Sequence, residues 1–166
     1  MTRFRLARMS PVILVFTLVL LLLPLGFIGS AGSGKLLLVI PGVLLVAIYA
    51  WVWLRFRPRF FVVRPDAIEV IWPLKRRQIP RAEISRVRLI DKDELRRETG
   101  WRMRVGAGGL WGGFGWLWTQ RRGIVQLYVS RPDGLVWIER VSDRPWLITP
   151  EQPEAFVRAL AKERIG

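Results

Sequence analysis

The sequence contains no cysteine and no histidine among its 166 residues. These absences exclude disulfides, thiolate and imidazole metal ligands, a cysteine nucleophile and histidine as general base. Acidic residues are scarce, with 13 Asp and Glu against 27 Lys and Arg. The remaining polar residues show no recognisable spacing of nucleophile, base and electrophile. We therefore expect no enzymatic activity, no catalytic residues, no metal and no cofactor.

Charge is also absent from two long stretches near the N-terminus. They are PVILVFTLVLLLLPLGFIG, residues 11–29, and LLLVIPGVLLVAIYAWVWL, residues 36–54. As a helix, each is long enough to cross a hydrocarbon core of about 30 Å. The proline within each is tolerated in a membrane span, because neighbouring groups satisfy the freed carbonyls. The sequence predicts a transmembrane helical hairpin, 11–29 and 36–54, with a short extracytoplasmic loop at 30–35.

GSAGSGK, residues 29–35, nearly matches the phosphate-binding P-loop G-x-x-x-x-G-K-[ST], with Leu36 in place of the hydroxyl residue. A P-loop needs a short buried strand before it and a soluble helix after it. Both flanks are instead apolar runs of membrane length. We interpret the stretch as the turn of the hairpin and expect it to bind no nucleotide.

Arginines flank both apolar stretches, whereas the connecting loop holds only Lys35. They are Arg3, Arg5 and Arg8 before the first stretch, and Arg55, Arg57 and Arg59 after the second. The positive-inside rule then places both ends in the cytoplasm, with residues 1–10 as a basic tail.

The alternative for the N-terminus is a signal peptide cleaved near residues 29–31. The apolar run is longer than the roughly 7–15 apolar residues of a typical signal peptide. Cleavage would leave the second span, and the rest of the chain would still be cytoplasmic.

From residue 58 onward, short strands are followed by one helix. FFVVRPDAIEVIW and LYVSRPDGLVWIE each contain two β-rich runs around a Pro-Asp turn, and RRQIP, SRVRLI, GWRMRV, WLWTQ and WLITP are typical of further strands. Phe156, Val157, Leu160 and Ala161 share one helical face, and the helix starts at Pro150 or at Pro153. This order predicts an α+β domain, with an antiparallel sheet or barrel closed by the final helix.

Three segments after the hydrophobic hairpin resemble the bacterial pleckstrin-homology (PH-like) family: WPLKRRQIPRAEISRVRLID, RVGAGGLWGGFGW and ITPEQPEAFVRAL. The most specific features are the helix entry at Thr149-Pro150 and the structural glycines Gly106, Gly109, Gly112 and Gly115. The resemblance implies a PH-like bent antiparallel β-barrel capped by a C-terminal α-helix over residues 58–166. With the predicted hairpin and its flanking arginines, the expected location is the bacterial inner (cytoplasmic) membrane, with the N-terminus and the C-terminal domain in the cytoplasm. A fold alone supplies no activity.

The glycine and tryptophan run at residues 105–118 has three interpretations. In the first, the glycines let the backbone cross closely at a barrel corner while Leu110, Phe114 and Leu117 fill the core. In the second, a loop with Trp111 at its tip docks on the bilayer interface, where tryptophan is enriched. The third is a groove for a ligand or a protein.

Two charged clusters complete the candidates. The basic one is Lys75, Arg76, Arg77 and Arg81. It is either a solvated sheet edge or, with Arg55, Arg57 and Arg59, a surface that orients the domain against anionic phospholipid headgroups. The acidic one, Asp91 to Glu94, offers carboxylates for Mg²⁺ or acid–base work. Neighbouring Arg96 and Arg97 favour instead a self-paired helical turn.

These observations predict a non-enzymatic, membrane-anchored interaction module that binds a protein partner or assembles with itself. The alternative is a sensor of anionic lipid surfaces that uses the basic and Trp-rich loops. An enzyme acting on a membrane substrate is a third class, without a recognisable catalytic constellation. We expect no nucleic-acid binding, because the positive charge is scattered and mostly flanks the membrane segments.

Overall fold

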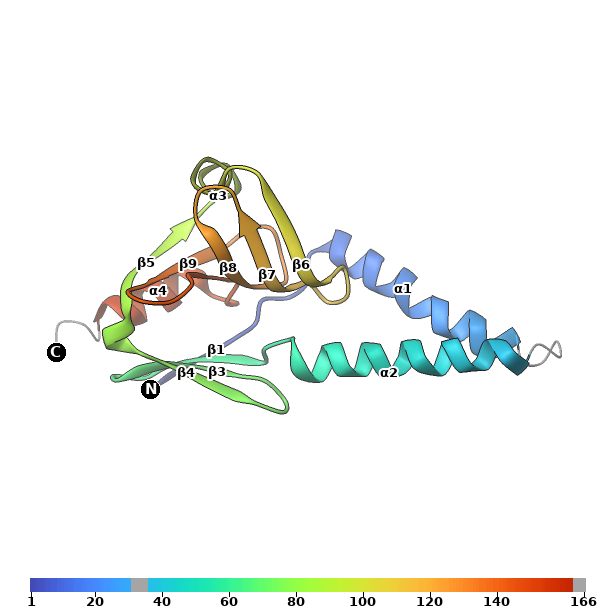
Figure 1. Ribbon diagram of the computed structural model, residues 1–166. Coiled ribbons are helices and arrows are strands. Elements are labelled where there is room, and N and C mark those ends of the chain that lie inside the picture. The colour runs from blue at the N-terminus through green and yellow to red at the C-terminus, as the bar shows by residue number, and fades with distance from the viewer. Residues whose placement is uncertain (31–35, 163–166) are drawn as a thin grey trace.

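Two apolar helices project together from a β-rich body (Figure 1). The computed structural model describes residues 1–30 and 36–162. Helix α1 is Pro11–Gly29, and helix α2 is Val39–Arg55 after a short 3-10 helix at Leu36–Leu38. At 19 residues, α1 is long and apolar enough to cross a bilayer, while α2 is a shorter apolar helix. The transmembrane hairpin stays a prediction. Its connection at residues 31–35, with most of the P-loop-like stretch, lies outside the described residues.

Local chemistry accounts for where α1 begins and how it meets α2. The side chain of Ser10 accepts a hydrogen bond from the backbone N–H of Ile13, and Pro11 occupies the first helical turn. The hydroxyl of Tyr49 donates to the carbonyl of Leu20 at 3.1 Å. This bond ties the two helices together halfway along their length.

The first sheet is antiparallel and has the order β1-β2-β3-β4. Its strands are Thr2–Arg5, Phe60–Val63, Ala67–Ile71 and Arg76–Pro80. Residues 2–5, expected in a basic tail, therefore form a strand that pairs Thr2 with Val63. The alternation explains the strand, because Phe4 is buried against Phe156 whereas its neighbours Arg3 and Arg5 are exposed.

The second sheet has the order β5-β9-β10-β8-β7-β6. Its strands are, in chain order, Ile84–Ile90, Arg102–Gly108, Gly113–Thr119, Gly123–Val129, Leu135–Arg140 and Trp146–Ile148. A 3-10 helix, Arg81–Glu83, connects the two sheets. Strands β8 and β10 are parallel, so the expectation of an entirely antiparallel arrangement is wrong there. The strands pair into two sheets, and the predicted closed barrel is not confirmed.

The second sheet is buried on both faces over its central strands. One face packs with the first sheet and helix α4, Pro153–Lys162, around Phe61, Trp146 and Phe156. The other face packs a smaller cluster against helix α3, Lys92–Thr99. Because neighbouring strand residues point to opposite faces, Tyr128 belongs to the main core and Leu127 to the smaller cluster. Helix α4 starts at Pro153, the second of the two predicted starts.

Candidate functional site

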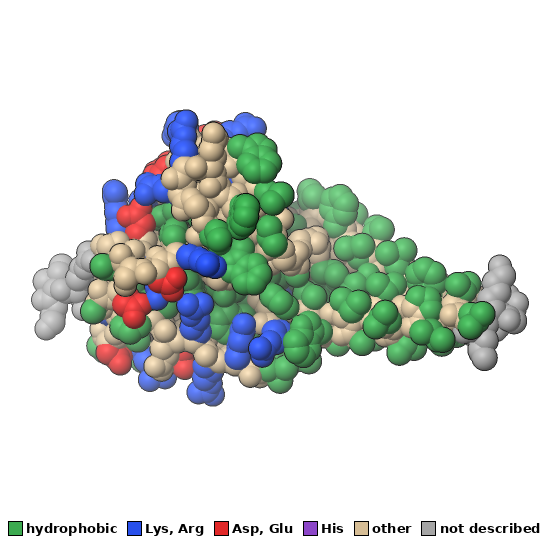
Figure 2. Space-filling view, viewed as in Figure 1, with side chains coloured by type: hydrophobic (Ala, Val, Ile, Leu, Met, Phe, Trp, Pro, Cys, Tyr) green, Lys and Arg blue, Asp and Glu red, His purple; other side chains and the backbone are tan. Residues whose placement is uncertain are grey.

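The β3–β4 turn folds back beside the end of α2. The indole Nε1 of Trp72 donates to the carbonyl of Phe56 at 3.1 Å, and the backbone N–H of Arg59 donates to the carbonyl of Ile71 at 2.7 Å. The turn thereby places Lys75 beside the C-terminal end of α2, where the chain enters the body. Figure 2 shows Lys and Arg side chains gathered there, next to the apolar helices.

Strand β1 adds a cation that the sequence analysis did not select. Arg3 lines a groove of about 460 Å³ together with Arg59, Lys75 and Arg76. In the sequence, both apolar helices separate β1 from β2. Arg3 reaches this place only because the two strands pair. We call the following six residues the basic rim: Arg3, Arg55, Arg57, Arg59, Lys75 and Arg76.

Five of the six rim cations, all except Arg76, lie over aromatic rings. The guanidinium of Arg3 is 3.4 Å from the ring centroid of Phe60, and Lys75 Nζ is 4.5 Å from that of Trp72. Within the described part of the chain, none of the six forms an ion pair with a carboxylate. Cation–π contacts contribute about 0.5–2 kcal/mol each, so they hold the side chains without neutralising them.

The electrostatics of Lys75 reflect this unbalanced charge. Burial lowers the pKa of Lys75, and repulsion from Arg55 and Arg77 lowers it further. An anion placed in the groove would relieve that repulsion. The arrangement therefore suits negatively charged groups.

Two of the predicted basic residues serve the fold instead of the rim. Arg77 pairs with Asp143 at 3.3 Å and lies over the Trp146 ring. Arg81 donates to the carbonyl of Leu160 in the last turn of α4, at 2.6 Å. Both side chains bind groups that are distant in the sequence. Their place in the sequence and their charge did not predict these partners.

Trp111 is held against the helices and is not a free loop tip. Its ring packs edge-on against Trp53 of α2, with centroids 4.8 Å apart. Its backbone N–H donates to the hydroxyl of Thr17 in α1 at 3.0 Å. The proton of that hydroxyl is shared between the carbonyls of Ile13 at 2.7 Å and Gly109 at 3.1 Å. The β6–β7 turn is therefore fastened beside the second turn of α1.

The four structural glycines all have positive φ: Gly106, Gly109, Gly112 and Gly115. Gly106 and Gly115 face each other across β6 and β7. A Cβ on Gly106 would lie 2.5 Å from the carbonyl oxygen of Phe114. Leu110, Phe114 and Leu117 are buried. This geometry supports the close-crossing interpretation of the run.

Beyond the turn, β6 and β7 expose an apolar face. The register pairs Met103 with Trp118 and Val105 with Trp116, so these four share one side of the ribbon. We call it the outer face. The exposed fraction rises away from the helices, from 40% at Val105 to 52% at Trp118. Figure 2 shows hydrophobic side chains as a band over these strands.

The outer face lies on the same side of the second sheet as the main core, but the first sheet and α4 do not bury it. Phe114 lies two residues before Trp116 on β7, hence on the same side, and it is buried in the main core. The sequence alone placed Trp116 and Trp118 on one strand face. Finding Met103 and Val105 opposite them required the register.

The acidic group is structural. The side chain of Asp91 caps α3 by accepting from the backbone N–H of Glu94 at 2.6 Å. Glu94 and Glu98 pair with Arg88 of β5, and Glu98 also pairs with Arg122 at 2.9 Å. The helical turn was predicted, but the pairing with Arg96 and Arg97 is wrong. Over residues 1–30 and 36–162, no cluster of three or more carboxylates offers a metal site.

Residues 59–164 match the family model described as Bacterial PH domain. No curated protein and no solved structure matches the chain.

Proposed function

The chain belongs to the bacterial PH domain family, and from this premise we propose that it is a non-enzymatic interaction module anchored in the bacterial inner membrane by α1 and α2. Domains of this family generally serve as non-catalytic interaction modules. The proposal adds the anchor, the surface that meets the lipid headgroups and the face offered to a partner.

The pairing of β1 with β2 supports an anchor that crosses the membrane twice. Strand β1 precedes α1, β2 follows α2, and the two strands are hydrogen-bonded neighbours. They must lie on the same side of any bilayer, so the intervening chain crosses it an even number of times. Figure 2 shows hydrophobic side chains along the helix pair. An apolar surface of this kind is typical of contact with lipid. Removal of a signal peptide would delete β1 from the sheet.

The observation that carries the proposal is the basic rim. Six cations without carboxylate partners among the described residues surround the point where α2 enters the body. The anionic headgroups of the cytoplasmic leaflet would lie at this level. Each Lys or Arg near such a surface contributes about 1 kcal/mol of attraction. We propose that the rim holds the body in one orientation on the membrane.

The outer face is the candidate surface for a protein partner. It is apolar and uncovered, and it includes β6, which is the edge strand of its sheet. The chain carries a net charge of +14, so a second copy would be repelled and an acidic partner attracted. We therefore favour a protein partner over self-assembly. In the lipid-sensor alternative, the same tryptophans would rest in the bilayer interface.

Single cysteines test the rim, because the natural chain has none. Leu74→Cys, in the rim turn, carries an environment-sensitive dye on the full chain in nanodiscs. We expect a blue shift with anionic lipids that is weaker with zwitterionic lipids. The shift should decline in salt, as the Debye length falls from about 10 Å at 0.1 M to about 3 Å at 1 M. Lys75→Gln with Arg76→Gln should reduce it, because two of the six rim charges are removed.

Two further positions provide the controls. Val141→Cys, exposed in the β9–β10 turn, should show no lipid dependence. Trp118→Cys reports on the outer face: a lipid-dependent shift there would favour the sensor alternative, and its absence would leave the face free for a partner. Identical spectra at Leu74→Cys and Val141→Cys in anionic lipid would contradict the role of the rim.

A further inference from the structure

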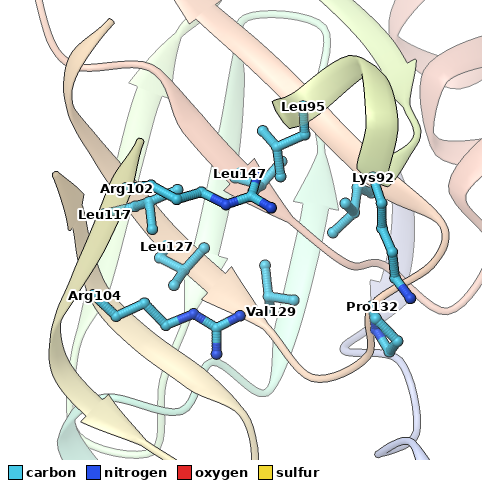
Figure 3. Close-up of a pocket in the computed structure, with 10 residues that line it drawn as sticks. Lys92, Leu95, Arg102, Arg104, Leu117, Leu127, Val129, Pro132 and Leu147 are labelled. Carbon is cyan, nitrogen blue, oxygen red and sulfur yellow. The ribbon is translucent and has the colours of Figure 1, made fainter. Parts of the chain in front are cut away.

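A cavity separate from the basic rim lies between α3 and the second sheet (Figure 3). Its volume is about 270 Å³, slightly below the range of about 300–1,000 Å³ that is typical of small-molecule sites. Its walls come from α3, from β6 to β10, and from the β8–β9 turn at Pro132. The cavity is the open part of the smaller core cluster.

The floor of the cavity is entirely aliphatic. Six buried side chains from α3 and four strands form it: Leu95, Leu117, Leu127, Val129, Leu135 and Leu147. Neither an aromatic ring nor a carboxylate is among the described residues that line it. Such a floor favours a flexible hydrocarbon chain.

Three cations reach the cavity from opposite walls. Arg102 and Arg104 lie on one face of β6, and Lys92 extends from the start of α3 on the other side (Figure 3). In the described parts of the chain, no carboxylate pairs with them. Nη1 of Arg102 is buried and has no hydrogen-bond partner there. The cavity thus combines an apolar floor with uncompensated positive charge.

This combination is unfavourable without a ligand. A buried donor without a partner is destabilising, and buried polar groups normally have partners. Burial lowers the pKa of Arg102, and repulsion from Arg96 and Arg104 lowers it further. An anion bound between the cations would provide the missing acceptor and reduce the repulsion.

We infer that the cavity binds an amphiphilic anion, with a hydrocarbon chain on the aliphatic floor and a carboxylate or phosphate head at Arg102, Arg104 and Lys92. A peptide fits less well, because its backbone amides would lose water over a floor without hydrogen-bonding groups.

The membrane is one source of such a ligand. Val129 of the floor precedes Ser130, whose carbonyl accepts a hydrogen bond from the backbone N–H of Ser10, the residue that caps α1. The cavity therefore begins next to the predicted membrane anchor. A free acid from solution is the other source, and it presents the same chemistry.

Photo-crosslinking on the full chain in zwitterionic nanodiscs tests the site. The probe is dodecanoic acid carrying a diazirine on its chain, and adducts are mapped by mass spectrometry. We expect adducts on β7, β8 or β10. Arg102→Gln with Arg104→Gln should reduce them at least about tenfold, since two charge-assisted hydrogen bonds are lost. Lys92→Gln, on the helix surface, should give a smaller loss, and Arg86→Gln on β5, outside the cavity, should give none.

Competitors define the ligand chemistry. Unlabelled dodecanoate should compete, whereas dodecanol, inorganic phosphate and an acidic peptide should not. Competition after anionic phospholipid is added to the nanodiscs would support a membrane lipid as source, and its absence would support a free acid. Labelling that survives both the double variant and Lys92→Gln would overturn the proposal. So would equal competition by dodecanol, or competition by phosphate or peptide in place of dodecanoate.

Discussion

A Cβ added to Gly112 would lie 2.4 Å from the carbonyl oxygen of Val129, and φ at Gly112 is +143°. Gly108, in the same run, has open space where a Cβ would lie and no positive φ. The fold therefore requires glycine at position 112, whereas it tolerates a side chain at position 108. The distinction rests on individual backbone contacts, which the composition of the run does not reveal.

Alanine should be strongly destabilising at Gly112 and nearly neutral at Gly108. We expect Gly112→Ala to lower the free energy of unfolding of the full chain by about 1–3 kcal/mol, from the strained φ and the close carbonyl. Gly108→Ala should change it by less than about 1 kcal/mol. Thermal unfolding in detergent measures both. Equal melting temperatures for the two variants would contradict the close-crossing interpretation.

At the scale of elements, α3 is fastened to the second sheet by Glu98. Its carboxylate pairs with Arg88 of β5 and with Arg122 in the β7–β8 turn. Burial alone would raise the pKa of Glu98, but the hydrogen bonds and charges of Arg88 and Arg122 outweigh it and leave that pKa below its usual value. The stabilisation is thus present above the unfolded-state pKa of Glu98 and is lost as pH falls through the lower folded-state pKa.

Glu98→Gln should therefore destabilise the protein in a pH-dependent manner. At pH 7 we expect a loss of about 1–2 kcal/mol, a value between exposed and buried ion pairs. The difference should begin to shrink as pH falls below the unfolded-state pKa of about 4.3, and it should vanish only below the lower folded-state pKa of Glu98. Asp93→Asn, in the same helix without an ion pair to any described residue, serves as the control. A difference in melting temperature that is unchanged from pH 7 to pH 3.5 would argue against this role.

How far these elements could be predicted depends on where their signals lie in the chain. The stretch RRQIP corresponds to β4, and the Pro65-Asp66 turn joins the paired strands β2 and β3. The hairpin predicted around Pro132-Asp133 is wrong, because β10 lies between β8 and β9 in the sheet. Strand β1 was missed because it has four residues and its partner follows both apolar helices. The parallel pairing of β8 with β10 was missed because no local turn specifies it.

The sequence predicted that a basic surface would lie near the helices, but not which residues would form it. Positive charge next to an apolar stretch indicated the right region. Two of the predicted residues stabilise the fold and are not part of the rim, because Arg77 pairs with Asp143 and Arg81 donates to the carbonyl of Leu160. Arg3 joined the rim only through strand pairing. The cavity beneath α3 is assembled from distant strands, so no local pattern could predict it.

At the scale of the whole molecule, the first sheet joins the two ends of the helix pair. The strand before α1 pairs with the strand after α2, and the rim lies where α2 enters the body. The module we propose is thus joined to its anchor through two neighbouring strands of one sheet, which limits rotation of the body relative to the membrane. A fixed orientation would leave the outer face, with Trp116 and Trp118, accessible to a partner.

Cysteine accessibility in intact bacterial cells tests this arrangement most directly, again because the natural chain lacks cysteine. A membrane-impermeant maleimide should label Ser30→Cys, at the end of α1, and should label Val141→Cys in the body only after the cells are lysed. That result would place both ends of the chain in the cytoplasm, with the helix connection outside. Labelling of Val141→Cys in intact cells, or of Ser30→Cys only after lysis, would contradict the anchor that we propose.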